Sequence, residues 1–166
     1  MVSADFLAGL FITLLQLFAG FAFSVSAVFI GITLFDKLTG GTREWDLIKK
    51  GNLAAGVLYA AIIFSLVLMI QPSIESTVMS ISATGNVLYY FAANVVVLVI
   101  SLLIAVLLIY ILLRIINMMT EDVEQMKEIH KGNVSVALVT ASALLAVSFV
   151  MQIAIKYLVT KLTSLV

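Results

Sequence analysis

Charged residues are grouped at a few points along this chain, and long apolar runs separate the groups. No Asp, Glu, Lys or Arg occurs between Asp5 and Asp36, Lys50 and Glu75, Glu75 and Arg114, or Lys131 and Lys156. A membrane-spanning helix needs about 20 apolar residues, and each of these gaps is that long. The pattern predicts four spans, at residues 6–35, 53–71, 87–119 and 134–162. Pro72 either ends the second span or kinks it into a short outer helix through Ser82.

A short phrase recurs where the second and fourth predicted spans begin. Lys50-Gly51-Asn52-Leu53-Ala54 is followed 81 residues later by Lys131-Gly132-Asn133-Val134-Ser135. Gln71 and Gln152 match at the same offset. The phrase predicts two tandem helical hairpins, residues 1–82 and 83–166, which together form one membrane domain.

Lysine and arginine predict how the hairpins insert. Seven of these residues lie in the loops at 36–52 and 114–133, and only two lie near the C-terminus: Lys37, Arg43, Lys49, Lys50, Arg114, Lys127 and Lys131, against Lys156 and Lys161. Because cytoplasmic loops are enriched in basic residues, both loops are expected in the cytoplasm and both termini outside. The two hairpins then run in the same direction, which makes the predicted fold an all-α integral membrane protein of parallel repeats. The first span lacks a basic segment before it and is expected to be retained rather than cleaved.

The two charged loops are expected to hold short surface helices. Thr42 and Thr120 are candidate N-caps, and Gly132 ends the second of these helices. Val123, Met126 and Ile129 share one face, which is predicted to lie on the membrane surface, and Trp45 and Ile48 occupy matching positions in the first loop.

Composition narrows the function. Hydrophobic residues make up 63% of the 166 residues, the net charge is zero and there is no cysteine, so neither a nucleic-acid partner nor a thiolate metal site is expected. His130 is the only histidine, and no catalytic set stands out, so neither an enzyme nor a cofactor or metal site is predicted. No ionisable residue occupies the middle of a span, which argues against active transport.

The Gly-Asn phrase has two interpretations. In the structural one, Gly51 and Gly132 permit a sharp turn, and Asn52 and Asn133 cap the helices that follow. In the functional one, the two helix N-termini act with Lys50 and Lys131 as a site for an anion such as a lipid headgroup.

Small residues mark faces where helices can approach closely. Gly9, Gly20 and Gly31 form one stripe on the first span, which fits packing within the chain, a subunit interface or a pore lining. The second and fourth spans carry small pairs at matching positions, and these pairs are expected to contact each other: Gly56 with Ala60, and Ala137 with Ala141.

Four amide side chains lie in or at the ends of spans: Gln16, Asn94, Gln71 and Gln152. Buried amides commonly link helices through hydrogen bonds. The alternative is a polar gate in which Gln71 and Gln152 act as a pair.

The segment Leu47-Ile48-Lys49-Lys50-Gly51-Asn52-Leu53-Ala54 resembles the family of small membrane proteins called domain of unknown function 350. The resemblance implies two tandem hairpins, each with a charged loop and a Gly-Asn-x-Ala start to its second helix. Gly51, Asn52 and Ala54 match this pattern, as do Gly132 and Asn133, while Ser135 replaces the alanine. The family implies a prokaryotic inner-membrane protein and supplies no activity.

The function that these patterns favour is a non-enzymatic membrane subunit that assembles through its small-residue faces. It would form a homo-oligomer or join a larger membrane complex, with lipids around it and a possible peripheral partner on the cytoplasmic loops. The alternative is a passive channel or small-solute facilitator lined by the four amides.

Overall fold

The computed structural model describes residues 4–39, 43–82, 86–119 and 125–164, and every element in them is helical. The four long helices are α1 (Ala4–Leu38), α3 (Leu53–Met79), α4 (Val87–Met119) and α6 (Val134–Thr163). Short helices α2 (Arg43–Lys49) and α5 (Gln125–His130) precede α3 and α6, and a 3-10 turn, η1 (Ser80–Ser82), follows α3. All four long helices are long and apolar enough to cross a membrane. The chain is therefore a multi-pass, all-helical membrane protein.

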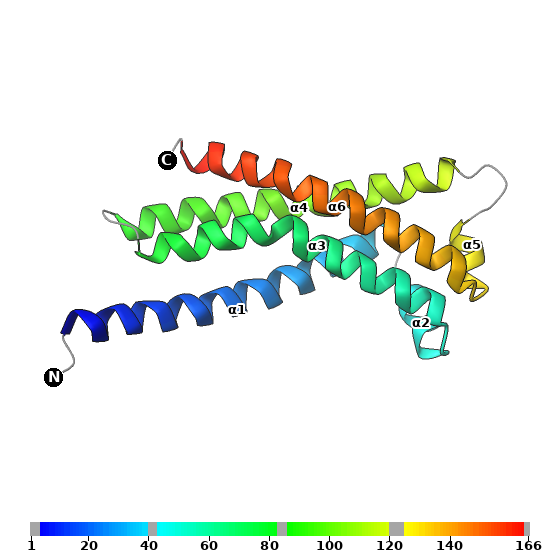
Figure 1. The fold of residues 1–166 in the computed structure, drawn as a ribbon, viewed down its shortest axis with the longest axis horizontal. Helices are drawn as coiled ribbons and strands as arrows, with labels where there is room; N and C mark the ends of the chain where they lie inside the picture. Colours follow the sequence, from blue (N-terminus) through cyan, green and yellow to red (C-terminus); the bar gives the residue numbers. More distant parts are fainter. Residues whose placement is uncertain (1–3, 40–42, 83–85, 120–124, 165–166) are drawn as a thin grey trace.

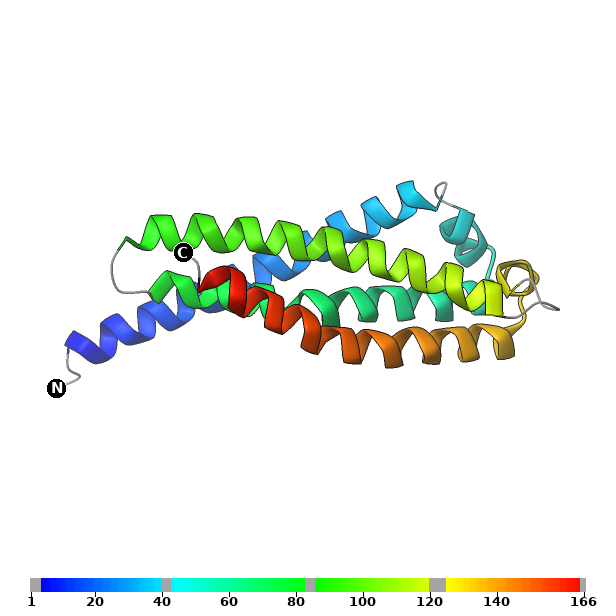
Figure 2. The same ribbon diagram turned by 90° about the horizontal axis from the view of Figure 1, so that it is seen from above.

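The long helices form one elongated bundle in which both termini lie at the same end (Figure 1). Helices α1 and α4 run away from that end, and α3 and α6 return to it, with α2 and α5 at the opposite end (Figures 1 and 2). That the two hairpins descend from one duplicated unit stays a prediction.

Helix α3 lies at the centre of the bundle. It contacts α1, α4 and α6, and 56% of its most apolar 18-residue window is buried, against 11% for α1. Leu58, Ile62, Leu66 and Met69 on its inner faces are at most 1% exposed. In a bilayer these side chains hold the helices together by close van der Waals packing rather than by leaving water.

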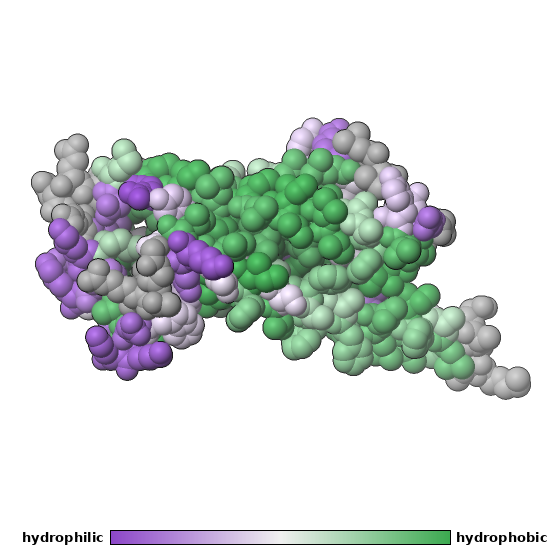
Figure 3. Space-filling model, turned by 180° about the vertical axis from the view of Figure 1, so that it is seen from behind, coloured by the Kyte–Doolittle hydropathy of each residue, from purple (hydrophilic) through white to green (hydrophobic). Residues whose placement is uncertain are grey.

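Helix α1 packs on the bundle along only part of its length. Ala27 and Phe35 are buried on its inner face, and Phe23 meets Phe91 of α4 with ring centroids 5.9 Å apart. Every side chain from residue 6 to residue 15 is exposed. The N-terminal part of α1 diverges from the other helices (Figure 1) and forms a hydrophobic projection on the surface (Figure 3).

Two sequence expectations about boundaries and surfaces are wrong. The second span does not end at residue 71, because α3 continues through Pro72 to Met79; a proline removes one backbone N–H, which membrane helices tolerate. Ile129 does not lie on the membrane surface but is 1% exposed, because α5 packs under α3 and α6. Thr42, Thr120 and Val123 lie outside the described residues.

The small pair on α3 is also not where the sequence placed it. Ala60 is exposed, and a Cβ built on Gly56 would meet no atom within 4 Å. Ala60, Phe64, Val67 and Gln71 are all exposed and form an outward stripe of α3, with half-buried Gly56 at its start. The small residues that α3 does bury are others: Ala54, Ala55 and Ala61. Their counterparts on α6 are buried: Ala137 and Ala141.

Candidate functional site: the two Gly-Asn turns and the α3–α6 seam

The repeated phrase forms the same turn twice. Gly51 has a positive φ of 81°; its N–H donates to the carbonyl of Ile48 at 2.9 Å, and the N–H of Asn52 donates to the carbonyl of Leu47 at 3.0 Å. This pair of bonds is the Schellman motif, which ends a helix at a residue in the left-handed conformation. The same pair recurs at Gly132, whose φ is 95°. Each glycine therefore ends a short helix and turns the chain into a span.

The asparagine of each turn caps the long helix that follows. The Asn52 side-chain oxygen accepts the Ala55 N–H at 3.0 Å, and the Asn133 oxygen accepts the Val136 N–H at 3.3 Å. Each bond satisfies one of the backbone donors left open in the first turn of a helix. These are the N-cap hydrogen bonds that the structural interpretation of the Gly-Asn phrase predicts.

The two asparagines differ in what their amide nitrogens bind. Asn52 Nδ2 donates to the carbonyls of Ile129 and His130, each at 3.0 Å, and so joins the start of α3 to the end of α5. Asn133 Nδ2 instead donates to Glu128 within its own loop at 3.3 Å. Only the first turn therefore bonds across the two halves of the chain through its asparagine.

The second turn carries a charged cluster in place of that link. Lys131 Nζ lies 2.7 Å from Glu128 Oε1, so an external anion would compete with the Glu128 carboxylate for this lysine. The hydrogen bond from Lys131, with a further one from Asn133, lowers the pKa of Glu128 below its usual value.

The lowered pKa of Glu128 gives an expected pH dependence. A carboxylate with a depressed pKa in the folded state stabilises that state above its ordinary pKa, and the contribution is lost as the pH falls through the lowered value. We expect the stability difference between wild type and Glu128→Gln to be present at neutral pH and to vanish in acid. Thermal unfolding in detergent across pH 7 to about 3 measures it. A difference that grows in acid would contradict the assignment.

Replacing Gly51 or Gly132 with alanine is expected to lower the free energy of unfolding by about 1–2 kcal/mol, because a Cβ crowds the next carbonyl in the left-handed conformation. The matched control is Gly56→Ala, where the backbone is helical and the added Cβ meets open space. That change is expected to be neutral or to stabilise by about 0.5–1 kcal/mol. Denaturant unfolding in micelles measures all three variants, and equal effects would count against the turn assignment.

The amides of the spans bond between helices. Gln152 Nε2 donates to Gln71 Oε1 at 2.9 Å. This bond joins α6 to α3 through the two glutamines that lie 81 residues apart, the same offset as the repeated phrase. Gln16 Nε2 donates to Ser82 Oγ at 3.1 Å and to the Val78 carbonyl at 3.4 Å.

Asn94 of α4 also bonds to α3, and there it receives two hydrogen bonds. Its side-chain oxygen accepts from Ser76 Oγ at 2.6 Å, and its backbone carbonyl accepts from Thr77 Oγ1 at 3.2 Å. The four amides therefore act at three separate places and share no common network.

The glycine stripe of α1 is divided between two environments. A Cβ on Gly31 would lie 2.6 Å from Leu66 Cδ1 and 3.1 Å from Leu102 Cδ1, and one on Gly20 would lie 3.5 Å from Val78 Cγ2. A Cβ on Gly9 would meet nothing within 4 Å. Gly20 and Gly31 thus pack against this chain's own helices, whereas Gly9 is open.

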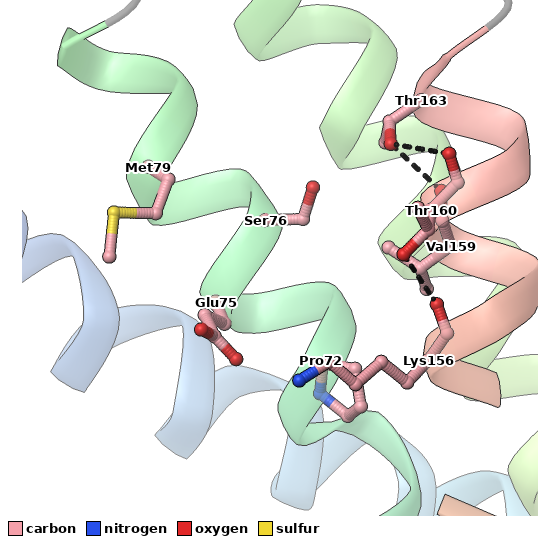
Figure 4. A pocket seen from close by; sticks show the side chains of 8 residues that line it. All are labelled: Pro72, Glu75, Ser76, Met79, Lys156, Val159, Thr160 and Thr163. Atoms are coloured by element: carbon pink, nitrogen blue, oxygen red, sulfur yellow. Dashed lines mark hydrogen bonds between the residues drawn. The ribbon is translucent and has the colours of Figure 1, made fainter. Parts of the chain in front are cut away.

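A pocket between α3 and α6 was not predicted from the sequence. It has a volume of about 210 Å³, and its lining includes Glu75 of α3 and Lys156 of α6 (Figure 4). The sequence does contain a signal for this pocket. Glu75 and Lys156 are charged residues near the ends of the second and fourth apolar runs, and they are separated by the same 81 residues as the two Gly-Asn turns. Among the described residues, no group of three His, Cys, Asp or Glu could hold a metal ion.

The fold and these contacts define a four-span helical membrane protein with a Gly-Asn turn before its second and fourth spans. The chain belongs to the family described as Domain of Unknown Function (DUF350), whose model matches residues 6–155. The comparisons with curated proteins and with solved structures found no match.

Proposed function

We propose that this chain is a non-enzymatic membrane subunit that assembles with another membrane helix through the N-terminal part of α1. The partner helix belongs to a second copy or to another subunit of a larger complex. The proposal places the chain in the cell membrane with both termini outside and the loops at 36–52 and 114–133 in the cytoplasm. The observation that carries it is the exposure of every side chain from residue 6 to residue 15.

The length of α1 indicates that part of this apolar helix must be covered by another protein. Its apolar segment, Phe6–Leu38, has 33 residues and is therefore about 50 Å long. To fit inside a hydrocarbon core of about 30 Å, it would have to tilt by about 50°, beyond the 0–40° range of membrane helices. Part of this apolar helix is therefore expected to lie outside the hydrocarbon.

The contacts of Gln16 indicate which part that is. Gln16 and Asp36 are 20 residues apart, about 30 Å along the helix, so the stretch between them alone crosses the core. Gln16 bonds to Val78 of α3 and Ser82 of η1, both of which follow Glu75 in the chain. Residues 6–15 continue past that level, where water would face Phe6, Leu10 and Phe11 unless another protein covers them.

The open glycine supports a helix as the partner. Gly20 and Gly31 receive side chains of this chain's own helices, and Gly9 continues the same stripe with nothing against it. Small residues let a second helix approach closely enough for backbone contact.

The arrangement of the amides favours assembly over the passive-channel alternative. A channel needs polar groups along one continuous path, but Gln16, Asn94 and the Gln71–Gln152 pair each bond a neighbouring helix at a separate place. These bonds use the amides to hold helices together.

Native mass spectrometry of the protein, extracted from its own membrane in mild detergent, tests the proposal. Assembly predicts masses at multiples of 17.9 kDa or release together with other polypeptides. A single chain with bound lipid alone would overturn it.

A further inference from the structure

The α3–α6 pocket lies at the end of the bundle that holds both termini (Figures 1 and 4). Its volume of about 210 Å³ is below the 300–1,000 Å³ of typical small-molecule sites. It fits a polar headgroup better than a whole ligand. Counted from Asn52 and Asn133 at about 1.5 Å per residue, Glu75 and Lys156 stand about 35 Å along their helices, which is the level of a bilayer interface.

The pocket carries one charge of each sign. Glu75 and Lys156 are both exposed, and they form no ion pair with each other although both line the cavity. In Figure 4 the Lys156 side chain runs from α6 towards α3, and its ammonium ends near Pro72. A ligand with two opposite charges can therefore meet both groups at once.

The hydroxyl groups in the lining act as acceptors. Ser76 Oγ donates to Asn94 at 2.6 Å, Thr160 Oγ1 donates to the Lys156 carbonyl at 2.9 Å, and Thr163 Oγ1 donates to the Val159 carbonyl at 2.9 Å. With their protons engaged, these oxygens keep lone pairs for an incoming donor. Together with the Glu75 carboxylate they suit a cation that carries several N–H groups.

The surface around the pocket is apolar. Met79, Ile153 and Tyr157 are 60%, 66% and 67% exposed. Acyl chains that leave the pocket towards the membrane centre would run along the exposed side chains of α6, Ile153 and Phe149 among them.

We propose that this pocket binds the headgroup of a zwitterionic phospholipid with a primary ammonium, as in phosphatidylethanolamine. The ammonium is held by Glu75 and the hydroxyl oxygens, and the phosphate is held by Lys156. A quaternary ammonium lacks N–H donors, and an anionic headgroup without an amine would face the Glu75 carboxylate. This site is independent of the proposed assembly and requires only that the chain spans a membrane.

The test is lipid binding to the delipidated full chain, followed by native mass spectrometry with dioleoyl-phosphatidylethanolamine, -phosphatidylcholine and -phosphatidylglycerol. Only the primary ammonium can donate N–H groups to the Glu75 carboxylate, so phosphatidylethanolamine is expected to bind about tenfold more tightly than phosphatidylcholine. Glu75→Gln should remove most of that preference, and Lys156→Gln should weaken binding of all three lipids. Glu128→Gln, at the opposite end of the bundle, should leave the binding of all three lipids unchanged.

Two results would overturn the proposal. One is equal occupancy by all three lipids in the wild type. The other is an unchanged preference for phosphatidylethanolamine in Glu75→Gln, with the variant shown to be folded by its helical circular dichroism and its unfolding temperature.

Discussion

Replacing Gly31 with leucine is expected to break the packing of α1 on α3 and α4. A Cβ alone would lie 2.6 Å from Leu66 Cδ1 and 2.8 Å from its Cδ2. Leu66 is 0% exposed and has little room to move aside. Overpacking a core by a few methylenes costs about 1–3 kcal/mol, and a leucine adds four carbon atoms. We expect at least the upper end of that range as a loss in the free energy of unfolding.

Gly9→Leu is the matched control for the fold, because the same residue change on the same helix meets open space. It is expected to be neutral or to stabilise by about 0.5–1 kcal/mol, because glycine is a poor residue in a helix interior. Unfolding of both variants in the same detergent measures the contrast. Similar destabilisation by the two changes would contradict the packing of α1 described above.

Gly9→Leu is also expected to have the largest effect on assembly. If the partner helix approaches at Gly9, the leucine side chain holds the two backbones apart and removes the close contact on which such interfaces depend. We expect the complex in mild detergent to be lost while the monomer keeps wild-type stability. Phe11→Leu, two residues along and therefore on a different side of α1, keeps an apolar side chain and should preserve the complex. A complex that survives Gly9→Leu at wild-type abundance would show that the partner binds elsewhere.

The sequence predicted the elements whose cause is local. The spacing of charges gave four spans because each apolar run matches the thickness of a bilayer. Gly51 and Asn52, with Gly132 and Asn133, predicted the two turns, since a left-handed glycine and an N-cap depend on neighbours within a few residues. Pro72 left two alternatives, an end of the second span or a further helical segment through Ser82, and the structure has the helix continue. Tertiary packing on α4, including the bonds from Ser76 and Thr77 to Asn94, supports a helix that the proline alone would interrupt.

The features that depend on which helices contact each other could not be predicted from the sequence. In the sequence, Gly56 and Ala60 resemble a packing pair as much as Ala137 and Ala141 do. Only the structure shows that Ala60 is exposed and that Ala137 and Ala141 are buried. The three glycines of α1 likewise look equivalent in the sequence, although in the structure Gly31 is closely packed and Gly9 is open. The α3–α6 pocket likewise depends on two helices that bring Glu75 and Lys156 to one cavity.

The most direct test of the proposed assembly is cysteine cross-linking along the projecting part of α1. The chain contains no cysteine, so single cysteines at positions 6 to 15 can be introduced one at a time, labelled with a thiol-reactive photocrosslinker and illuminated in native membranes, which captures a second copy or a different subunit alike. The account predicts cross-linked species that peak at positions 9 and 13, with the period of about 3.6 residues of a helix packed on a helix. Cross-linking to protein that is absent or uniform at all ten positions would mean that no partner helix packs on this segment, and would contradict the proposed assembly.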